Sequence, residues 1–152
     1  MEAKDLTGFF EKLSEVMEGS RAYLIKLDSV VGDGDLGLTM GDGFAAAWAY
    51  VKECGESDIG KLLYGAGKAM STAVPSTMGT LMASGWMRAG KELKGKTQMD
   101  GADFTAMFEA YLAGVADRGK AEVGDKTFLD GLSPAVDAMK QAQGEEKAPG
   151  EI

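Results

Sequence analysis

Apolar residues recur at the three- and four-residue spacing of an α-helix along most of this chain, in segments that glycine-rich loops separate. The first segment predicts a helix over roughly residues 5–27, and the second predicts one over about residues 38–54. Four further segments each follow a capping or helix-breaking signal. These signals are Ser57 or Asp58, Pro75, Asp100 and the polar loop 118–127. Because few segments alternate in the manner of a β-strand, the sequence predicts six helices in an all-α bundle or barrel.

The length of 152 residues suits one domain with a single hydrophobic core. Glycines at positions 65, 67 and 85 fall inside predicted helices, where they predict close contact between helices. The last residues are polar and include Pro149. We therefore expect one helical domain over residues 1–143 and a flexible tail over residues 144–152.

Charge and composition exclude several classes of function. The chain has 24 acidic and 16 basic residues, a net charge of −8, whereas nucleic-acid binding needs a basic face. It has no histidine and one cysteine, Cys54, so histidine triads, histidine zinc sites and internal disulfides are excluded. Any metal must be held by oxygen ligands, which favours Mg²⁺, Ca²⁺ or Mn²⁺.

The sequence also lacks the signals of a membrane or secreted protein. No apolar run approaches the ~20 residues needed to span a bilayer. The first five residues have neither the charged nor the apolar region of a signal peptide. These patterns predict a cytoplasmic protein with neither membrane nor nucleic acid as a partner.

Three aspartates, Asp28, Asp33 and Asp35, lie in one short loop with glycines on both sides of Asp33. Crowded carboxylates repel one another, and Asp28 ends a predicted helix, where an acid opposes the helix dipole. A bound cation would relieve both costs. The alternative is a solvated Asp/Gly turn. An EF-hand does not fit, because no glutamate stands at the bidentate position.

Two other polar segments are candidates for ligand binding. Ser76, Thr77 and Gly79 lie at the start of a predicted helix, where amides and hydroxyls suit a phosphate. An ordinary capped helix start is the alternative. Residues 124–127 precede the last helix and are equally consistent with a turn and a cap. No Gly-x-x-x-x-Gly-Lys-Ser/Thr motif is present, which excludes a P-loop.

Together these segments resemble the nucleotide-binding (L) subunit of dihydroxyacetone kinase. The likeness extends to about residue 142 and rests on the order and spacing of two motifs. The first is Leu27-Asp28-x-x-x-Gly32-Asp33-x-Asp35-x-Gly37-x-x-Met40. The second is Arg118-Gly119-Lys120-Ala121, followed by Gly124-Asp125-Lys126-Thr127 and Asp130.

The resemblance implies a barrel of eight antiparallel helices that holds a nucleotide at one end through two Mg²⁺ ions. By position, Asp28, Asp33 and Asp35 match the metal ligands. The remaining matched positions are expected to line the nucleotide. They are Leu36, Gly37, Leu38 and Thr39, then Ser76, Thr77, Met78 and Gly79 on the phosphate side, and Gly119 and Phe128 beside the adenine and ribose.

Family members continue through two further helices that close over the nucleotide. Nothing in this chain corresponds to them, so we expect a barrel that is incomplete relative to the family. Phe128 is equally consistent with a place in the hydrophobic core.

The activity implied is phosphoryl transfer to a small hydroxy-ketone such as dihydroxyacetone. The donor would be ATP, or tightly bound ADP recharged by a phosphotransferase-system (M) subunit. A separate substrate-binding (K) subunit would hold the ketone, and a homodimer is also compatible with the likeness. Two alternatives stay open: a non-catalytic nucleotide-binding regulatory module, and a degenerate helical scaffold without a ligand.

Overall fold

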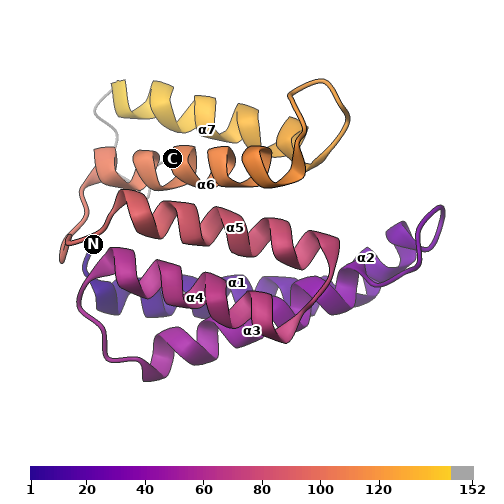
Figure 1. Cartoon of the computed structure of the whole chain (residues 1–152), viewed down its shortest axis with the longest axis horizontal. Coiled ribbons are helices and arrows are strands. Elements are labelled where there is room, and N and C mark those ends of the chain that lie inside the picture. Colours follow the sequence, from indigo (N-terminus) through magenta and orange to yellow (C-terminus); the bar gives the residue numbers. More distant parts are fainter. Residues whose placement is uncertain (145–152) are drawn as a thin grey trace.

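The computed structural model describes residues 1–144 and contains seven α-helices in that part of the chain (Figure 1). They are α1 (Ala3–Gly19), α2 (Arg21–Asp28), α3 (Leu36–Glu53), α4 (Ile59–Ala73), α5 (Thr77–Glu92), α6 (Gly101–Gly119) and α7 (Phe128–Gly144). The described residues form no β-strand, only an isolated bridge between Glu2 and Gln98. The all-α prediction is therefore confirmed.

The prediction of one continuous helix over residues 5–27 is wrong. Helix α1 ends at Gly19 and α2 begins at Arg21, with Ser20 between them at φ −92° and ψ −4°. A glycine followed by a serine is a common place for a helix to bend, because glycine favours the helix weakly and serine competes for backbone hydrogen bonds. The described part of the chain thus has seven helices where six were expected.

Three of the expected helix starts are confirmed by their caps. Asp58 accepts a hydrogen bond from the Lys61 amide at the start of α4, at 3.1 Å. Ser76, directly after Pro75, caps α5, and Asp100 caps α6. Each side-chain oxygen pairs with an amide that has no partner inside its own helix, which fixes where the helix begins.

Successive helices pack side by side, α1 against α3, then α3 on α4, α4 on α5, α5 on α6 and α6 on α7 (Figure 1). Helix α2 packs on α3, and it projects with its following loop from one end of the array. The ends of α2 and α6 and the starts of α3, α5 and α7 are joined by loops at this same end. All the residues predicted to bind a ligand lie in these loops and helix ends.

An aromatic cluster from α1, α5 and α6 fills much of the core. The ring of buried Trp86 lies 4.9 Å from that of Phe10 and 4.8 Å from that of Tyr111, centroid to centroid. A Cβ on Gly85 would lie 2.7 Å from the Tyr111 ring, so α5 and α6 can approach this closely only with glycine there. The predicted role of Gly85 in helix packing is confirmed.

The expected tail falls almost entirely outside the described residues. Gly144, placed in that tail by the sequence, is instead the last residue of α7. Among residues 1–144, every helix is too short or too polar to cross a lipid bilayer.

Candidate metal and nucleotide site

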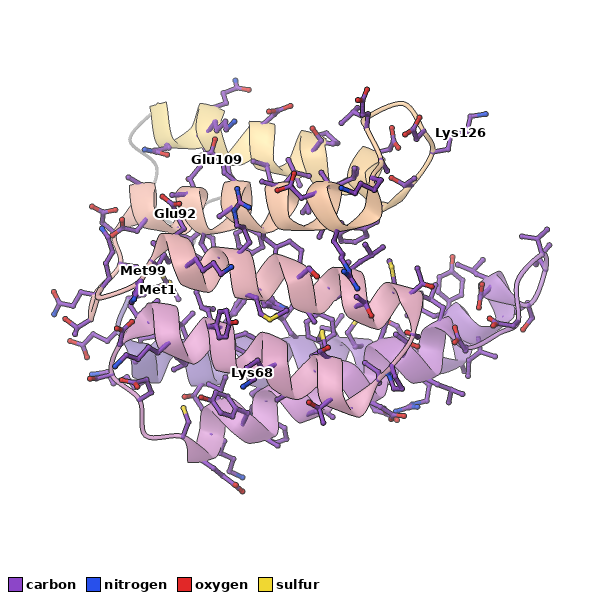
Figure 2. The ribbon with its side chains drawn as sticks, in the orientation of Figure 1. Met1, Lys68, Glu92, Met99, Glu109 and Lys126 are labelled. Atoms are coloured by element: carbon purple, nitrogen blue, oxygen red, sulfur yellow. The ribbon has the colours of Figure 1, made fainter. Side chains whose placement is uncertain are left out.

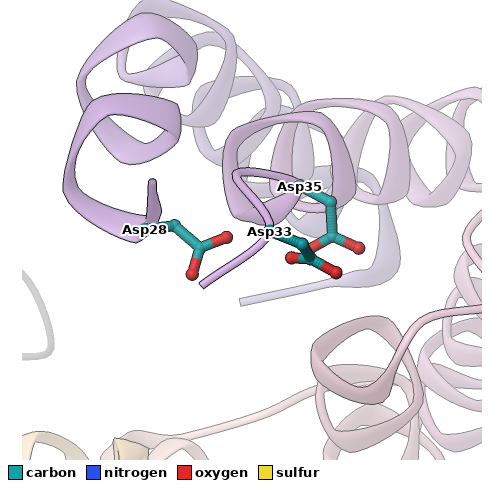
Figure 3. Close-up of side chains that lie close together, drawn as sticks. All are labelled: Asp28, Asp33 and Asp35. Atoms are coloured by element: carbon teal, nitrogen blue, oxygen red, sulfur yellow. The ribbon is translucent and has the colours of Figure 1, made fainter. Parts of the chain in front are cut away.

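The three aspartates predicted to bind metal converge between the end of α2 and the start of α3 (Figure 3). Each offers one carboxylate oxygen, and these oxygens all lie within 4.8 Å of one another. Asp28 is the last residue of α2 and Asp35 is the N-cap residue of α3, so two helix ends fix their positions. The sequence prediction that these side chains lie together is confirmed in geometry.

The loop is folded around Asp28. Its backbone carbonyl accepts the Gly32 amide at 2.7 Å, and its carboxylate accepts the Leu36 amide at 3.3 Å. A Cβ on Gly32 would lie 2.2 Å from Oδ1 of Asp28, so any side chain there would displace the carboxylate. Gly34 has φ +79°, a backbone conformation that residues with a side chain rarely adopt. These two glycines allow the loop to turn tightly enough to bring the aspartates together.

The electrostatics of the cluster favour a cation. Burial raises the pKa of Asp35, and the neighbouring carboxylates of Asp33 and Asp28 raise it further. Asp35 makes no side-chain cap to its own helix. Within the described residues, neither the Asp33 nor the Asp35 carboxylate has a hydrogen-bond or ion-pair partner. An all-oxygen donor set with free lone pairs is the kind that Mg²⁺ prefers, so these residues fit the implied metal.

The next predicted residues, 36–39, form the first turn of α3. Gly37 is buried, and a Cβ there would lie 2.2 Å from the Arg21 carbonyl of α2. Leu38 is exposed, whereas Leu36 packs against the core. Thr39 is 5% exposed and points its hydroxyl toward α5. Of these four residues, Leu38 therefore presents its side chain to solvent, and Thr39 presents its hydroxyl to the start of α5.

A hydrogen bond joins this turn to the second predicted segment. Thr39 Oγ1 and Ser76 Oγ lie 3.0 Å apart. Ser76 Oγ also accepts the Gly79 amide at 3.0 Å, so one hydroxyl caps α5 and links it to α3. The aspartate loop and the N-terminal end of α5 are thereby brought side by side, although 37 residues separate Thr39 from Ser76.

The start of α5 faces the end of α6 across an open groove of about 450 Å³. Ser76 and Thr77 line one side, and Gly119 lines the other, so three predicted nucleotide residues share it. Arg118 lines the same groove. Sequence reasoning gave Arg118 no role of its own, although it precedes Gly119 in the second motif. A guanidinium here offers the fixed positive charge that suits phosphate.

The structure does not bring all predicted residues to this groove. Met78 is half-buried and packs against the core, and Gly79 is buried. Phe128, the first residue of α7, is half-buried and packs against the core rather than lining the groove. Its expected place beside the adenine stays a prediction.

The loop from α6 to α7 is held by Asp130. Its carboxylate accepts the Gly124 amide at 2.7 Å and the Thr127 amide at 2.8 Å. These hydrogen bonds lower the pKa of Asp130. Lys120 and Lys126 take left-handed backbone conformations in the loop, at φ 55° and 60°. The residues of the second motif therefore fix the conformation of this loop.

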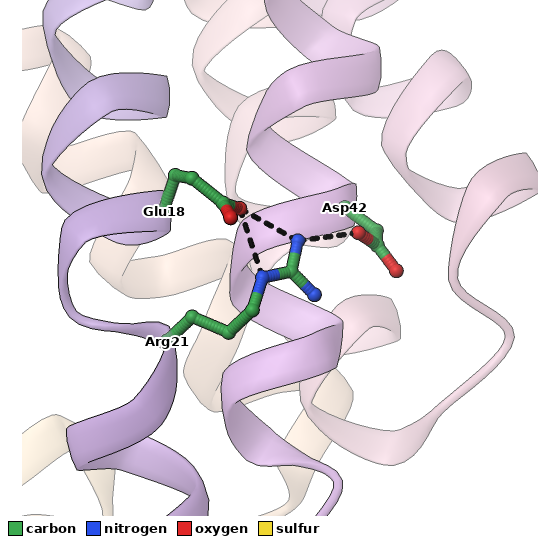
Figure 4. Close-up of polar contacts among 3 residues, drawn as sticks. All are labelled: Glu18, Arg21 and Asp42. Atoms are coloured by element: carbon green, nitrogen blue, oxygen red, sulfur yellow. Dashed lines mark hydrogen bonds and ion pairs between the residues drawn. The ribbon is translucent and has the colours of Figure 1, made fainter.

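A charged cluster at the start of α2, which sequence reasoning missed, fixes this helix (Figure 4). The Arg21 guanidinium donates to Glu18 of α1 at 2.7 Å and to Asp42 of α3 at 2.6 Å. Both carboxylates raise the pKa of Arg21, so it stays charged. The only sequence signal was the three-residue spacing of Glu18 and Arg21. The cluster ties α2, which ends at Asp28, to its two neighbours.

The sequence model of the DAK2 domain matches residues 30–151, which is most of the chain. The chain belongs to the DAK2 domain family. The region matched begins just after Asp28 and includes the first motif from Gly32 onward, the α5 start and the second motif. This DAK2 domain also resembles solved and curated proteins over almost its whole length.

Two curated relatives are ADP-binding subunits. The ADP-binding subunit DhaL of PEP-dependent dihydroxyacetone kinase 2 from Listeria innocua is 33% identical over 132 residues, covering 86% of this chain and 61% of the relative. The corresponding DhaL subunit of PEP-dependent dihydroxyacetone kinase from Escherichia coli K12 is 28% identical, covering 90% of this chain and 65% of the relative. The chain thus spans less than two thirds of these relatives' length.

The fold matches a solved dihydroxyacetone kinase. The crystal structure of the C. freundii enzyme in complex with AMP-PNP and Mg²⁺ superposes with a TM-score of 0.76 at 24% identity. The match covers 91% of this chain and 25% of that chain. At this identity the superposition shows that the DAK2 domain shares the helical fold.

Proposed function

We propose that this DAK2 domain is the nucleotide- and magnesium-binding part of a dihydroxyacetone-type kinase. Asp28, Asp33 and Asp35 would hold two Mg²⁺ ions. Three carboxylates supply too few oxygens for two octahedra, so phosphate oxygens would complete the coordination. The phosphates of ADP or ATP would extend from the aspartates to the N-terminal end of α5, at Ser76 and Thr77.

One observation carries the proposal. Three carboxylates each offer an oxygen within 4.8 Å of the others at the start of α3, and the Thr39–Ser76 hydrogen bond of 3.0 Å joins this helix to the N-terminal end of α5. The aspartates provide negative charge for a cation, and the amides at the start of α5 provide partial positive charge for an anion. A metal-bound phosphate chain needs both, whereas a bare cation site needs only the first.

Bound Mg²⁺ would supply neutralisation of the charge on the phosphoryl group during its transfer. The residues of this chain would bind the nucleotide and orient its phosphates. Arg118 and Gly119 form the far wall of the α5 groove, where the rest of the nucleotide would lie. The chain has no histidine, and we assign activation of the acceptor to a partner protein.

The relatives guide the choice of acceptor and partner. Their names, ADP-binding subunits of dihydroxyacetone kinases, support a small hydroxy-ketone such as dihydroxyacetone as the acceptor. We assign the binding of this ketone to a separate substrate-binding (K) subunit. The PEP-dependent relatives support a phosphotransferase-system (M) subunit that recharges bound ADP, with free ATP as the other source. We expect kinase activity only when the K-type partner is added, and activity of this chain alone would contradict the division of labour.

Calorimetric titration with ADP, with and without Mg²⁺, tests the site. We expect binding that depends on Mg²⁺ and is weakened at least ~10-fold by Asp33→Asn, because a charged ligand to the metal is lost. The matched control is Asp137→Asn, which makes the same change of charge at an exposed position on α7.

The outcomes separate the proposal from its alternatives. Mg²⁺-dependent ADP binding without activity in the presence of a K-type partner would indicate a regulatory module. No binding of ADP by a folded chain would indicate a scaffold. Equal affinity of the Asp33→Asn and Asp137→Asn variants would show that the aspartate loop is not the metal site.

A further inference from the structure

A second groove, lined by lysines, runs between α4 and α5 away from the aspartates. Lys61 and Lys68 come from α4, Lys91 comes from α5, and Lys94 from the turn that follows α5, so cations stand on both sides of the groove. Helices α4 and α5 face the viewer in Figure 1, and Figure 2 marks Lys68 on the front of α4. The groove has a volume of about 460 Å³, within the range of small-molecule sites.

Three glycines line this groove, where neighbouring helices approach one another closely. A Cβ on Gly60 would lie 2.5 Å from the Gly90 carbonyl oxygen, so the two helices touch there through glycines. A Cβ on Gly65 would lie 2.1 Å from the hydroxyl oxygen of Tyr50, which lies over α4 from α3. Tyr50 and Tyr64 both line the groove and add polar hydroxyls to its apolar ring surface. A side chain at Gly60 or Gly65 would clash with these neighbours, so glycine is needed for the helices to pack this closely beside the groove.

The charge of the groove is not balanced by the protein. Lys61 lies 3.9 Å from Glu56, the limit of an ion pair. Within the described residues, Lys68, Lys91 and Lys94 have no carboxylate within 4.0 Å. A chain with a net charge of −8 thus gathers four of its 16 basic residues around one hollow. Such a concentration of one sign attracts anions and is relieved by binding one.

The groove is distinct from the proposed nucleotide site, but a hollow between them shares lining residues with each. Tyr64 and Lys91 also line the next hollow, where Arg88 and Arg118 add positive charge. Arg88 is paired with Asp117 at 3.2 Å. Arg118 in turn reaches the groove at the start of α5. The lysine groove itself shares no lining residue with that site.

We propose that the groove between α4 and α5 is a metal-independent binding site for a small polyanion, a compound with two or more phosphate or carboxylate groups. The ammonium groups of Lys68, Lys91 and Lys94 bind the charges from both sides, and the hydroxyl of Tyr64 donates a hydrogen bond. A concave hollow with cations on opposite walls matches a compact ligand that they surround, whereas a flat basic face would match a protein.

Titration of ¹⁵N-labelled protein followed by NMR tests this site, with inorganic pyrophosphate and citrate as probes in metal-free buffer at about 0.15 M salt. We expect saturable shifts at the amides of Gly60, Gly65 and Gly90. The double variant Lys68→Gln/Lys91→Gln weakens binding of at least one probe by roughly tenfold or more. If only pyrophosphate shows this pattern, the site accepts phosphate groups. If both probes show it, the site accepts phosphates and carboxylates alike.

The control Lys12→Gln/Lys140→Gln removes the same charge from two lysines that pair with Glu15 and Glu109. It is expected to bind the probes as the unaltered protein does. Equal weakening in both double variants would show a general charge effect and overturn the proposal, as would the absence of saturable shifts with either probe at 0.15 M salt. Shifts produced by polyglutamate but by neither small probe would replace the small-molecule site with a protein-docking surface.

The site stands apart from the proposed function. Asp33→Asn leaves pyrophosphate binding in the lysine groove unchanged, and Lys68→Gln/Lys91→Gln leaves Mg²⁺-dependent ADP binding unchanged. Either site can therefore fail its test without the other.

Discussion

The hydrogen bond between Thr39 and Ser76 connects the two halves of the proposed site, and its removal has a calculable cost. In Ser76→Ala, α5 loses its N-cap hydrogen bond to Gly79, which costs about 1 kcal/mol. The bond to Thr39 is also lost, and the hydroxyl of this buried residue is left without its partner, for about 1 kcal/mol more. We expect a loss of about 2 kcal/mol in the free energy of unfolding.

Urea and thermal denaturation measure this loss. For a domain of this size, about 2 kcal/mol corresponds to a fall in Tm of roughly 4–8 °C. Ser84→Ala is the matched control. The Ser84 hydroxyl donates only to Thr80 of its own helix, at 2.7 Å, so we expect a change of less than ~0.5 kcal/mol there.

A double-mutant cycle isolates the link between the helices. Thr39→Val removes the other partner, and in the double variant the second change costs less because the bond is already gone. We expect a coupling energy of about 1 kcal/mol. A coupling near zero, or a Ser76→Ala variant as stable as Ser84→Ala, would refute the claim that this bond holds the aspartate loop against α5.

Two further predictions concern the frame around the site. Gly85→Ala should lower the free energy of unfolding by about 1–3 kcal/mol, because its Cβ would lie 2.7 Å from the Tyr111 ring. The control is Gly131→Ala, whose Cβ would meet nothing within 4 Å, and it should be neutral or stabilising in the same denaturation assay. Backbone hydrogen bonds lower the pKa of Asp130, so its contribution to stability is present above the unfolded-state pKa of about 3.9 and is lost as the pH falls through the lower folded value. The gap in urea midpoint between the unaltered protein and Asp130→Asn should therefore be present at pH 7 and shrink at pH 3; a gap independent of pH would contradict the assignment.

Helix positions were predictable from the sequence where a cap and an apolar stripe agreed. Asp58, Ser76 and Asp100 each supply a side-chain oxygen to the first turn of their helix, and periodicity follows immediately. The break at Ser20 was missed because the apolar spacing continues across it. The sequence marks this break only by the Gly19-Ser20 pair, whereas contacts between helices fix the direction that the chain takes after it. Arg21 binds acids on both α1 and α3 and thereby sets the direction of α2.

The aspartate cluster was predictable because its members are close in sequence. Three carboxylates so close together repel one another unless a cation offsets their charge, which indicates a metal site. The pairing of Thr39 with Ser76 was not, since no pattern in one sequence shows which residues meet across 37 positions. Arg118 was missed for the same reason. Its importance depends on the groove that it shares with Thr77, and that groove exists only when α5 and α6 are packed together.

The central claim is that the aspartate loop and the start of α5 form one site for a metal-bound nucleotide. Mn²⁺ in place of Mg²⁺ tests it directly, because the unpaired electrons of Mn²⁺ broaden the NMR signals of nearby amides. With ADP present, we predict broadening at Gly34 in the aspartate loop and at Gly79 in α5, and neither in Asp33→Asn. Broadening confined to the loop, or unchanged by ADP, would show a cation site without a nucleotide and would contradict the account.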